Sequence, residues 1–272
     1  MLLNHYITVS AVLFVLGVSY LNAEENPVKK TFRPSTLTEN ITVPFKTTFD
    51  RGALNGDGTT LHIMPFIPGG TVGDWNIFNR AVIPLANVDG AIVGGNNPSP
   101  EPGNGASGLG DINYALIFSP VDYDTFIWGV GPALTIPSAS DGQLGSGKWN
   151  TGIAGMFLKP TDWGNILVRG AQVWSFAGDS DRKDVNRLMI EPIITYNMGD
   201  GWHLFTDMII SANWKAESNN RWIVPLGGGF GRSFKIGDKT LLSRLEAYYN
   251  VERPKGAPEY SVSFTIQFVF PK

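Results

Sequence analysis

The sequence predicts an all-β fold, a closed antiparallel up-and-down transmembrane β-barrel of about twelve strands. Three observations predict it. Segments of about 10–14 residues alternate apolar with polar side chains, the connections between them alternate short with long, and all eight tryptophans lie at segment ends. Such segments suit tilted strands that cross a bilayer, and they exceed the length of about five or six residues usual in soluble sheets.

The composition excludes several classes of protein. The 272-residue chain has a net charge of −3, so its charge does not indicate nucleic acid as a partner, and none is expected. It contains no cysteine, which excludes a disulfide framework and thiolate chemistry. The 32 glycines and the aromatic content of 12% favour β structure with many turns.

The N-terminus has the pattern of an export signal. The first 23 residues contain no Lys, Arg, Asp or Glu, and the apolar run 7–18 is followed by small and polar residues. This pattern predicts a signal peptide over residues 1–23, cleaved after Ala23, with an N-terminal membrane anchor as the alternative. Residues 24–39 are expected to be a flexible segment that enters the lumen as a plug, and residues 40–272 the barrel. The expected location is the outer membrane of a Gram-negative bacterium.

The strands are expected from a period of two. Along 259–271, Tyr260, Val262 and Phe264 alternate with serine and threonine, and 202–215 repeats the pattern. A soluble secreted β-sandwich that binds carbohydrate would show the same alternation and stays an alternative. The twelve expected strands are 40–51, 59–68, 75–88, 108–121, 126–138, 148–160, 165–177, 185–198, 202–215, 221–236, 239–252 and 259–271.

The connections and the tryptophans favour the membrane barrel over the sandwich. Outer-membrane barrels have short turns at one end, longer loops at the other, and aromatic girdles at both interfaces. The short connections are 69–74, 122–125, 161–164, 199–201 and 237–238, and the longer ones 52–58, 89–107, 139–147, 178–184, 216–220 and 253–258. The expected membrane-interface aromatics are Trp75, Trp128, Trp163 and Trp202 at the short-turn end, and Trp149, Trp174, Trp214 and Trp222 at the long-loop end.

Charges within the strands fall mostly on the face opposite the apolar one. A lipid-facing Arg or Lys at the bilayer midplane costs about 2–4 kcal/mol, so these charges are expected to line the lumen. They could instead pair with one another simply to fill the barrel. The expected lumen-lining charges are Lys46, Asp50, Arg80, Asp111, Arg169, Arg187, Glu191, Asp207, Arg244 and Glu246, mixed with Phe66, Phe78, Ile117, Met189, Phe205 and Ile209.

Some residues depart from the regular pattern. Gln172 shares the face of Trp174, and a kink is expected at the glycine run 227–229. Proline cannot donate to a ladder, so bulges are expected at some of the prolines inside strands. These are Pro44, Pro65, Pro84, Pro132, Pro192 and Pro225.

Two glycine-rich stretches approach phosphate-binding motifs. Residues 103–108 spell GxGxxG, but a Pro-rich loop precedes them and a β pattern follows. Residues 142–149 approach a P-loop, but Trp149 replaces the Ser or Thr that would bind magnesium. Both stretches are interpreted as loops, and no cofactor is expected.

Neither the acidic residues nor the histidines show the sequence pattern of a metal-binding or catalytic site. The loop 178–184 holds three Asp residues interleaved with an Arg and a Lys, so a solvated loop is expected there rather than a metal site. His62 and His203 lie beyond the signal peptide without a nucleophile motif beside them. No catalytic and no metal-binding residue is therefore assigned.

Several stretches together resemble a family of bacterial outer-membrane proteins, known for the MetA pathway of phenol degradation or as transporters and sometimes mislabelled neuromedin U. The similarity spans about residues 40–272, and the family implies an outer-membrane β-barrel that passes small hydrophobic or aromatic compounds. It supplies no catalytic residues to transfer. The matching stretches are 108–111, 129–132 with Pro137, 144–149, 220–222 through 225–229, 248–251 with Arg253-Pro254, and 267–272.

These expectations combine into a functional hypothesis. A twelve-strand barrel with a mixed lining is expected to be a passive channel or transporter for small, hydrophobic or aromatic solutes. The expected partners are outer-membrane lipid, the small-molecule solute and the barrel assembly machinery. The alternatives are an outer-membrane enzyme that acts on lipid esters and a structural barrel with a closed lumen.

Overall fold

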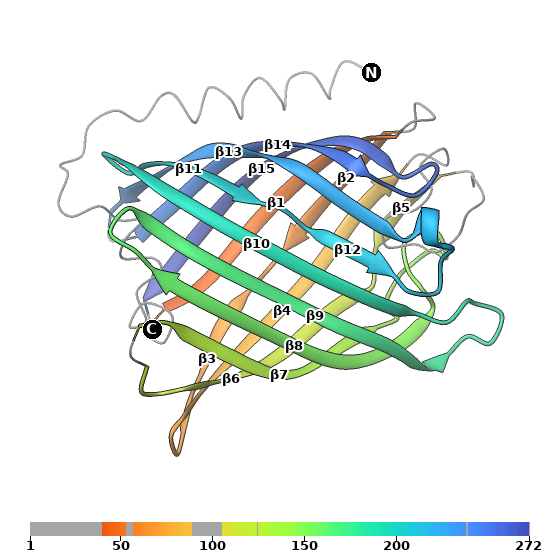
Figure 1. Ribbon diagram of the computed structural model, residues 1–272, viewed down its shortest axis with the longest axis horizontal. Helices are drawn as coiled ribbons and strands as arrows, with labels where there is room; N and C mark the ends of the chain where they lie inside the picture. The colour runs from red at the N-terminus through yellow and green to blue at the C-terminus, as the bar shows by residue number, and fades with distance from the viewer. Residues whose placement is uncertain (1–39, 53–56, 89–104, 124, 238, 272) are drawn as a thin grey trace.

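The computed structural model describes residues 40–52, 57–88, 105–123, 125–237 and 239–271, which form a closed antiparallel β-barrel of twelve strands (Figure 1). The barrel closes where the first strand, β1 (Asn40–Gly52), pairs with the last, β15 (Pro258–Pro271). The predicted signal peptide, the segment 24–39 and most of the loop 89–107 lie outside the described residues. No helix in the described part of the chain is long and apolar enough to cross a membrane.

The remaining strands follow one another round the ring in chain order. Three of the twelve are interrupted, so the described residues form fifteen segments: β2 continues as β3, β5 as β6, and β11 as β12. The segments between β1 and β15 are β2 (Asp57–Ile63), β3 (Phe66–Val72), β4 (Trp75–Val88), β5 (Ala106–Leu109), β6 (Ile112–Pro120), β7 (Ile127–Ile136), β8 (Lys148–Pro160), β9 (Gly164–Gly178), β10 (Asn186–Gly199), β11 (Trp202–Asp207), β12 (Ile210–Asn213), β13 (Trp222–Ile236) and β14 (Lys239–Glu252). A short 3-10 turn, Ser218–Asn220, precedes β13.

Prolines lie beside all three interruptions, as the sequence predicts for some of them. A proline has no amide hydrogen, so the ladder loses a bond there and the adjacent strand bends away from regular pairing. The amide at each interruption still reaches the proline carbonyl of the neighbouring strand. Met64, Gly110 and Met208 donate to the carbonyls of Pro44, Pro84 and Pro192 at 3.0, 2.9 and 3.3 Å.

Strand β13 has an incomplete ladder at the glycine run. It pairs with β11 only as far as Gly229, and with β12 from Ile223. Residues 224–228 between these points pair with β14, where the register shifts between Val224 and Pro225. The Thr206 hydroxyl bridges part of the gap by donating to the Gly227 carbonyl at 3.0 Å. The wall is therefore irregular where the sequence predicts a kink.

One predicted connection is wrong. The sequence places a turn over residues 69–74, whereas β3 continues to Val72 and the turn to β4 is the pair 73–74. The glycines at 69 and 70 carry a β-bulge instead of a turn, because the register shifts between Pro68 and Gly70 and Gly70 has a φ of 94°. Glycine signals both features equally well from sequence.

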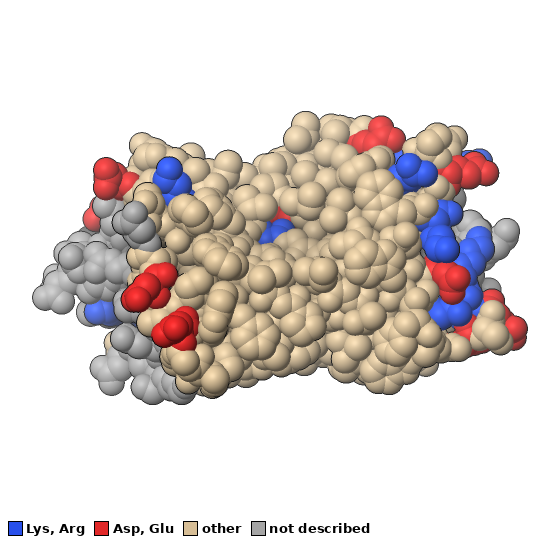
Figure 2. Space-filling model, turned by 60° about the horizontal axis from the view of Figure 1, so that its bottom comes forward, with Lys and Arg blue, Asp and Glu red and all other residues tan. Residues whose placement is uncertain are grey.

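The two faces of the strands separate by residue type. On β15, Ser263 and Thr265 are buried in the barrel, whereas Val262 between its serine neighbours is 40% exposed on the outer wall. The outer wall exposes many other large apolar side chains, including Ile153, Leu204 and Leu226. Figure 2 shows the result on one face: charged residues gather at the two ends, and the wide middle is uncharged apart from a small central spot seen between its side chains.

The strands pack too closely at some glycines for any side chain. A Cβ on Gly229 would meet the Leu245 carbonyl and lie 2.8 Å from the Glu246 Cβ, whereas a Cβ on Gly155 would find only one atom, at 3.6 Å. We expect Gly229→Ala to lower the free energy of unfolding by about 1–3 kcal/mol through overpacking. Urea unfolding of the refolded barrel, followed by its heat-dependent gel shift, measures this loss.

Gly155→Ala is the matched control, because its new methyl group meets no atom closer than ordinary contact. Equal unfolding midpoints for the two variants would contradict the packing described here.

Candidate functional site

The interior of the barrel holds a cluster of charged side chains. Lys46 of β1 is 8% exposed and Glu246 of β14 is 3% exposed. The Lys46 ammonium lies 2.6 Å from the Glu246 carboxylate and 3.8 Å from the carboxylate of Asp207 at the end of β11. Buried charges are costly unless paired, and the Lys46 ammonium pairs with both carboxylates.

A second set of charges reaches across the lumen. Arg169 of β9 forms a two-pronged pair with Glu191 of β10, through its Nε and Nη2 atoms. Arg80 of β4 lies 3.8 Å from the same Glu191 carboxylate. Four strands (β6, β7, β8 and β9) separate β4 from β10 on one side of the ring, and six on the other, so the Arg80–Glu191 contact spans nearly the full width of the barrel.

Three of the remaining predicted lining charges also lie on inward-facing strand positions. Asp50 is half-buried on β1 opposite Ser261, and Arg187 is half-buried on β10 opposite Val173. Arg244 of β14 is half-buried, with its guanidinium 4.8 Å above the Phe205 ring. The interior position of these groups follows the strand alternation. Their role in lining a path for solute stays a prediction.

Asp111 serves the loops at the long-loop end. Its carboxylate accepts hydrogen bonds from the Ser146 amide at 2.6 Å, the Ser146 hydroxyl at 2.8 Å and the Ala139 amide at 3.3 Å. Its position between β5 and β6, at an interruption, aims it at the loop before β8 rather than along the lumen. Asp111 therefore anchors that loop to the barrel wall.

Arg182 holds the same loop from the other side. Its guanidinium donates to the carbonyls of Ser146 at 3.3 Å, Gly142 at 2.7 Å and Gly145 at 2.6 Å. A pocket of about 180 Å³ lies between these loops, lined in part by Asp111, Asp141 and Asp179. Sequence reasoning missed this role, because an arginine among aspartates carries no signal that distinguishes a loop anchor from a solvated charge.

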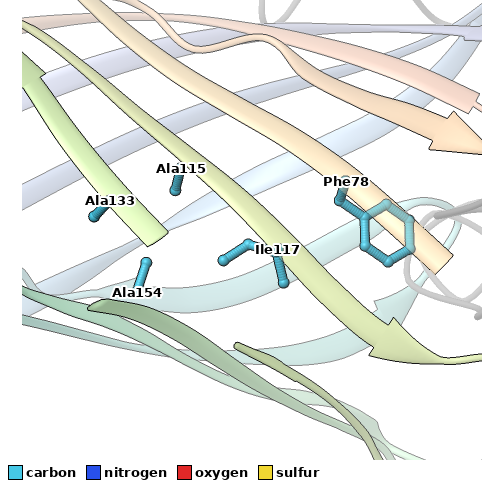
Figure 3. Packing of buried hydrophobic residues seen from close by; sticks show 5 residues of the cluster. All are labelled: Phe78, Ala115, Ile117, Ala133 and Ala154. Carbon is cyan, nitrogen blue, oxygen red and sulfur yellow. The ribbon is translucent and has the colours of Figure 1, made fainter. Parts of the chain in front are cut away.

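The wall formed by β4, β6, β7 and β8 lines the interior with apolar side chains. Phe78, Ala115, Ile117, Ala133 and Ala154 form a buried cluster (Figure 3), and partly buried hydrophobic side chains of the neighbouring strands pack against it. The predicted lining residue Phe66 stacks on Phe78 with ring centroids 5.2 Å apart, and Phe205 is also buried. Ile209, in contrast, is 41% exposed at the interruption between β11 and β12. The interior therefore has a mainly charged side and a mainly apolar side, and Arg80 of β4 is a charge on the apolar side.

Glycines on β13 allow β14 side chains to reach β11. A Cβ on Gly227 would lie 2.9 Å from the Tyr248 ring, and one on Gly231 would lie 2.8 Å from the Arg244 stem. With no side chains there, Tyr248 crosses β13, accepts a hydrogen bond from the Asp207 amide at 2.7 Å and donates to Glu246 at 2.9 Å. The sequence analysis identified the glycine run but not this function.

The tryptophans form pairs near the ends of the strands. Trp75 and Trp128 meet edge to face with centroids 6.0 Å apart at the short-turn end, and Trp214 and Trp222 do so at 5.5 Å at the long-loop end. Trp163 stacks on Tyr196. Six of the eight, all except Trp202 and Trp222, are more than a third exposed. Their assignment to a membrane interface stays a prediction that this arrangement suits.

The remaining motifs are part of the fold. The last three residues of GxGxxG, 106–108, lie in β5, and Lys148 near the end of the near P-loop begins β8, so neither precedes a helix. Lys148 pairs with Asp184 of the acidic loop at 3.6 Å. His203 is fully buried with Nδ1 3.3 Å from the Gly201 carbonyl, and His62 lies on β2 opposite Lys46. Among the described residues, no group of three or more His, Cys, Asp or Glu is arranged to hold a metal.

Comparison with known proteins rests on structure. No protein-family model and no curated protein matches the sequence. The COG4313 outer membrane channel from Pseudomonas putida F1 aligns with a TM-score of 0.62 over 93% of this chain and 100% of that chain, at 14% identity. The chain has the fold of an outer-membrane β-barrel.

Two further solved structures align with lower scores. The translocator domain of autotransporter NalP from Neisseria meningitidis has a TM-score of 0.45, covers 85% of this chain and 87% of its own, and is 11% identical. OccAB3 from Acinetobacter baumannii has a TM-score of 0.35, covers 85% and 98%, and is 8% identical.

Breaking the interior network should destabilise the barrel. Arg169→Met would leave the buried Glu191 carboxylate with only the longer contact to Arg80, so we expect a loss of about 3–5 kcal/mol in the free energy of unfolding. Arg51→Met removes the exposed pair with Asp57 and should cost under about 1 kcal/mol. Urea titration of the folded fraction compares them, and equal losses would contradict a supporting role for the interior pair.

Proposed function

We propose that this protein is a passive outer-membrane channel for small amphipathic solutes, including aromatic ones. The observation that carries the proposal is the mixed interior, in which charges lie mainly on β1, β9, β10, β11 and β14, with Arg80 on β4, and the apolar cluster lies on β4, β6, β7 and β8. A solute with one polar end and an apolar body finds complementary groups on both sides.

The outer surface supports the location. The uncharged middle of the barrel and its exposed apolar side chains form a band that would aggregate in water and that hydrocarbon solvates. The tryptophan pairs at the strand ends suit the two interfaces of such a band. Outer-membrane lipid is then the outer partner, and the barrel assembly machinery inserts the folded strands. The predicted signal peptide, cleaved after Ala23, would direct export.

The resemblance to the phenol-degradation family supports aromatic solutes within this proposal. The Arg80–Glu191 contact is the feature that favours the alternative of a closed structural barrel, because it spans the lumen and narrows any path through it. An esterase is less well supported. His203 Nε2 has no hydrogen-bond partner in the described residues, so no serine hydroxyl is paired with it.

Transport is tested with the purified barrel in liposomes. We expect phenol to enter at least about tenfold faster than glucose, because the apolar wall desolvates the ring while the charged side binds its hydroxyl. Stopped-flow light scattering with both permeants measures the rates, with protein-free liposomes subtracted. Rates equal to those of empty liposomes for every permeant would favour the closed barrel.

The cross-lumen contact offers a separate test of the path. Arg80→Ala removes a long side chain from the middle of the lumen and should raise single-channel conductance by about twofold or more, because a narrow constriction dominates the resistance of a pore. Arg232→Ala is the control, since Arg232 stacks on Trp202 at the outer wall. A conductance unchanged by Arg80→Ala would place the ion path elsewhere.

A further inference from the structure

Arg244 presents an unused binding edge to the interior. Its Nε and Nη2 atoms are buried, and neither has a hydrogen-bond partner in the described residues. Lys46, Arg80 and Arg169 each contact a carboxylate within 4 Å, whereas Arg244 forms no such ion pair with the described residues. A buried guanidinium edge without a partner is unusual, because groups of this kind are nearly always paired.

Arg169 in the same lumen shows how such an edge holds a carboxylate. Arg169 uses its own Nε and Nη2 atoms to hold both oxygens of the Glu191 carboxylate. That pair of donors, side by side in one plane, matches the spacing of carboxylate oxygens. Arg244 therefore has the donor geometry that Arg169 uses, with the carboxylate missing.

The surroundings hold the Arg244 edge in place. Its guanidinium lies 4.8 Å from the centre of the Phe205 ring, which fixes its plane from one side. The nearby carboxylates are engaged elsewhere: Glu246 binds Lys46 and Tyr248, and Asp207 lies 3.8 Å from Lys46. One Asp207 oxygen, Oδ1, has no partner in the described residues. Its negative charge would repel an anion that approached Arg244 from the side of Asp207.

Further unpartnered polar atoms lie on β9, β10, β11 and β13, the strands that follow one another toward β14. Strand pairing places Asn197 opposite His203, His203 opposite Gly231, and Gly231 opposite Arg244. The unpartnered atoms include the Asn165 and Asn197 amide nitrogens and the Thr195 and Ser233 hydroxyls, all buried. These groups supply hydrogen-bond donors, and the fully buried His203 offers Nε2 as a further polar atom. Of these groups, His203 and Ser233 lie nearest to Arg244 in the strand pairing, because His203 is opposite Gly231 and Ser233 is two residues further along β13.

We propose that Arg244 binds the carboxylate of a small amphipathic solute, with the apolar part of the solute against Phe205. This inference rests on the proposed function and names its substrate class, small organic carboxylates. The Nε and Nη2 donors hold the two oxygens of the carboxylate. An uncharged analogue of the same shape cannot form this pair of charge-assisted hydrogen bonds.

Benzoate and benzyl alcohol are matched probes, because they share a ring and differ in the carboxylate. Isothermal titration of the folded barrel in neutral detergent should show benzoate bound at least about tenfold more tightly than benzyl alcohol, as expected for a charge-assisted two-pronged contact. Arg244→Met should abolish the preference. Arg244→Lys should retain only part of the preference for benzoate, because lysine keeps the positive charge but lacks the two side-by-side donors of the guanidinium.

Arg232→Lys is the matched control on β13, and it should leave benzoate binding unchanged because Arg232 stacks on Trp202 at the outer wall. The heat-dependent gel shift confirms that each variant is folded. Equal binding of the two probes by the wild type, or a benzoate preference that survives Arg244→Met, would overturn the inference.

Binding and transport are read separately. Benzoate binding lost in Arg244→Met, combined with no solute flux, would support the site while rejecting the channel. Phenol flux without any preference for benzoate would support the channel while rejecting the site.

Discussion

The structure depends on one constraint, the closure of the sheet between β1 and β15. Thirteen pairs of residues, from Asn40 opposite Pro271 to Gly52 opposite Pro258, join the two ends of the chain into a ring. A closed ring leaves no strand edge unpaired, which is a requirement for a sheet that crosses hydrocarbon. It also gives every strand one inner and one outer face, so a period of two in sequence becomes a separation between an ionic interior and an apolar wall.

The interior that results is asymmetric because of where small residues lie. On β13, glycines at 227, 229 and 231 remove the side chains that would separate β11 from β14, so Tyr248 and Arg244 lie across the strand and meet β11 groups. On the opposite wall, alanines around Phe78 and Ile117 leave an apolar surface. Charge and apolar area therefore lie mainly on two sides of one lumen, with Arg80 of β4 as a charge beside the apolar cluster, and this division underlies both proposals.

Much of the fold is predictable from sequence because strand alternation is local. The boundaries of β4, β8 and β14 agree with the predicted strands, and the prolines predict where ladders break. The glycines at 69 and 70 predict a turn where the structure has a β-bulge, because glycine is common in both. Partners such as Arg80 and Glu191 could not be paired in advance, since which side chains meet across a lumen depends on the stagger of the whole ring. The role of Arg182 could not be predicted for a similar reason, because its guanidinium joins two loops that are distant in sequence.

The absence of cysteine permits a direct test of the central claim, that the apolar face of each strand meets lipid and the polar face the lumen. Single cysteines at successive positions 260–266 of β15, each carrying a nitroxide spin label in the reconstituted barrel, report their accessibility to oxygen and to a water-soluble nickel complex. We predict that oxygen accessibility peaks at Tyr260, Val262, Phe264 and Ile266 and falls at Ser261, Ser263 and Thr265. Accessibility without alternation, or nickel access dominant at Val262 and Phe264, would contradict a membrane-spanning barrel.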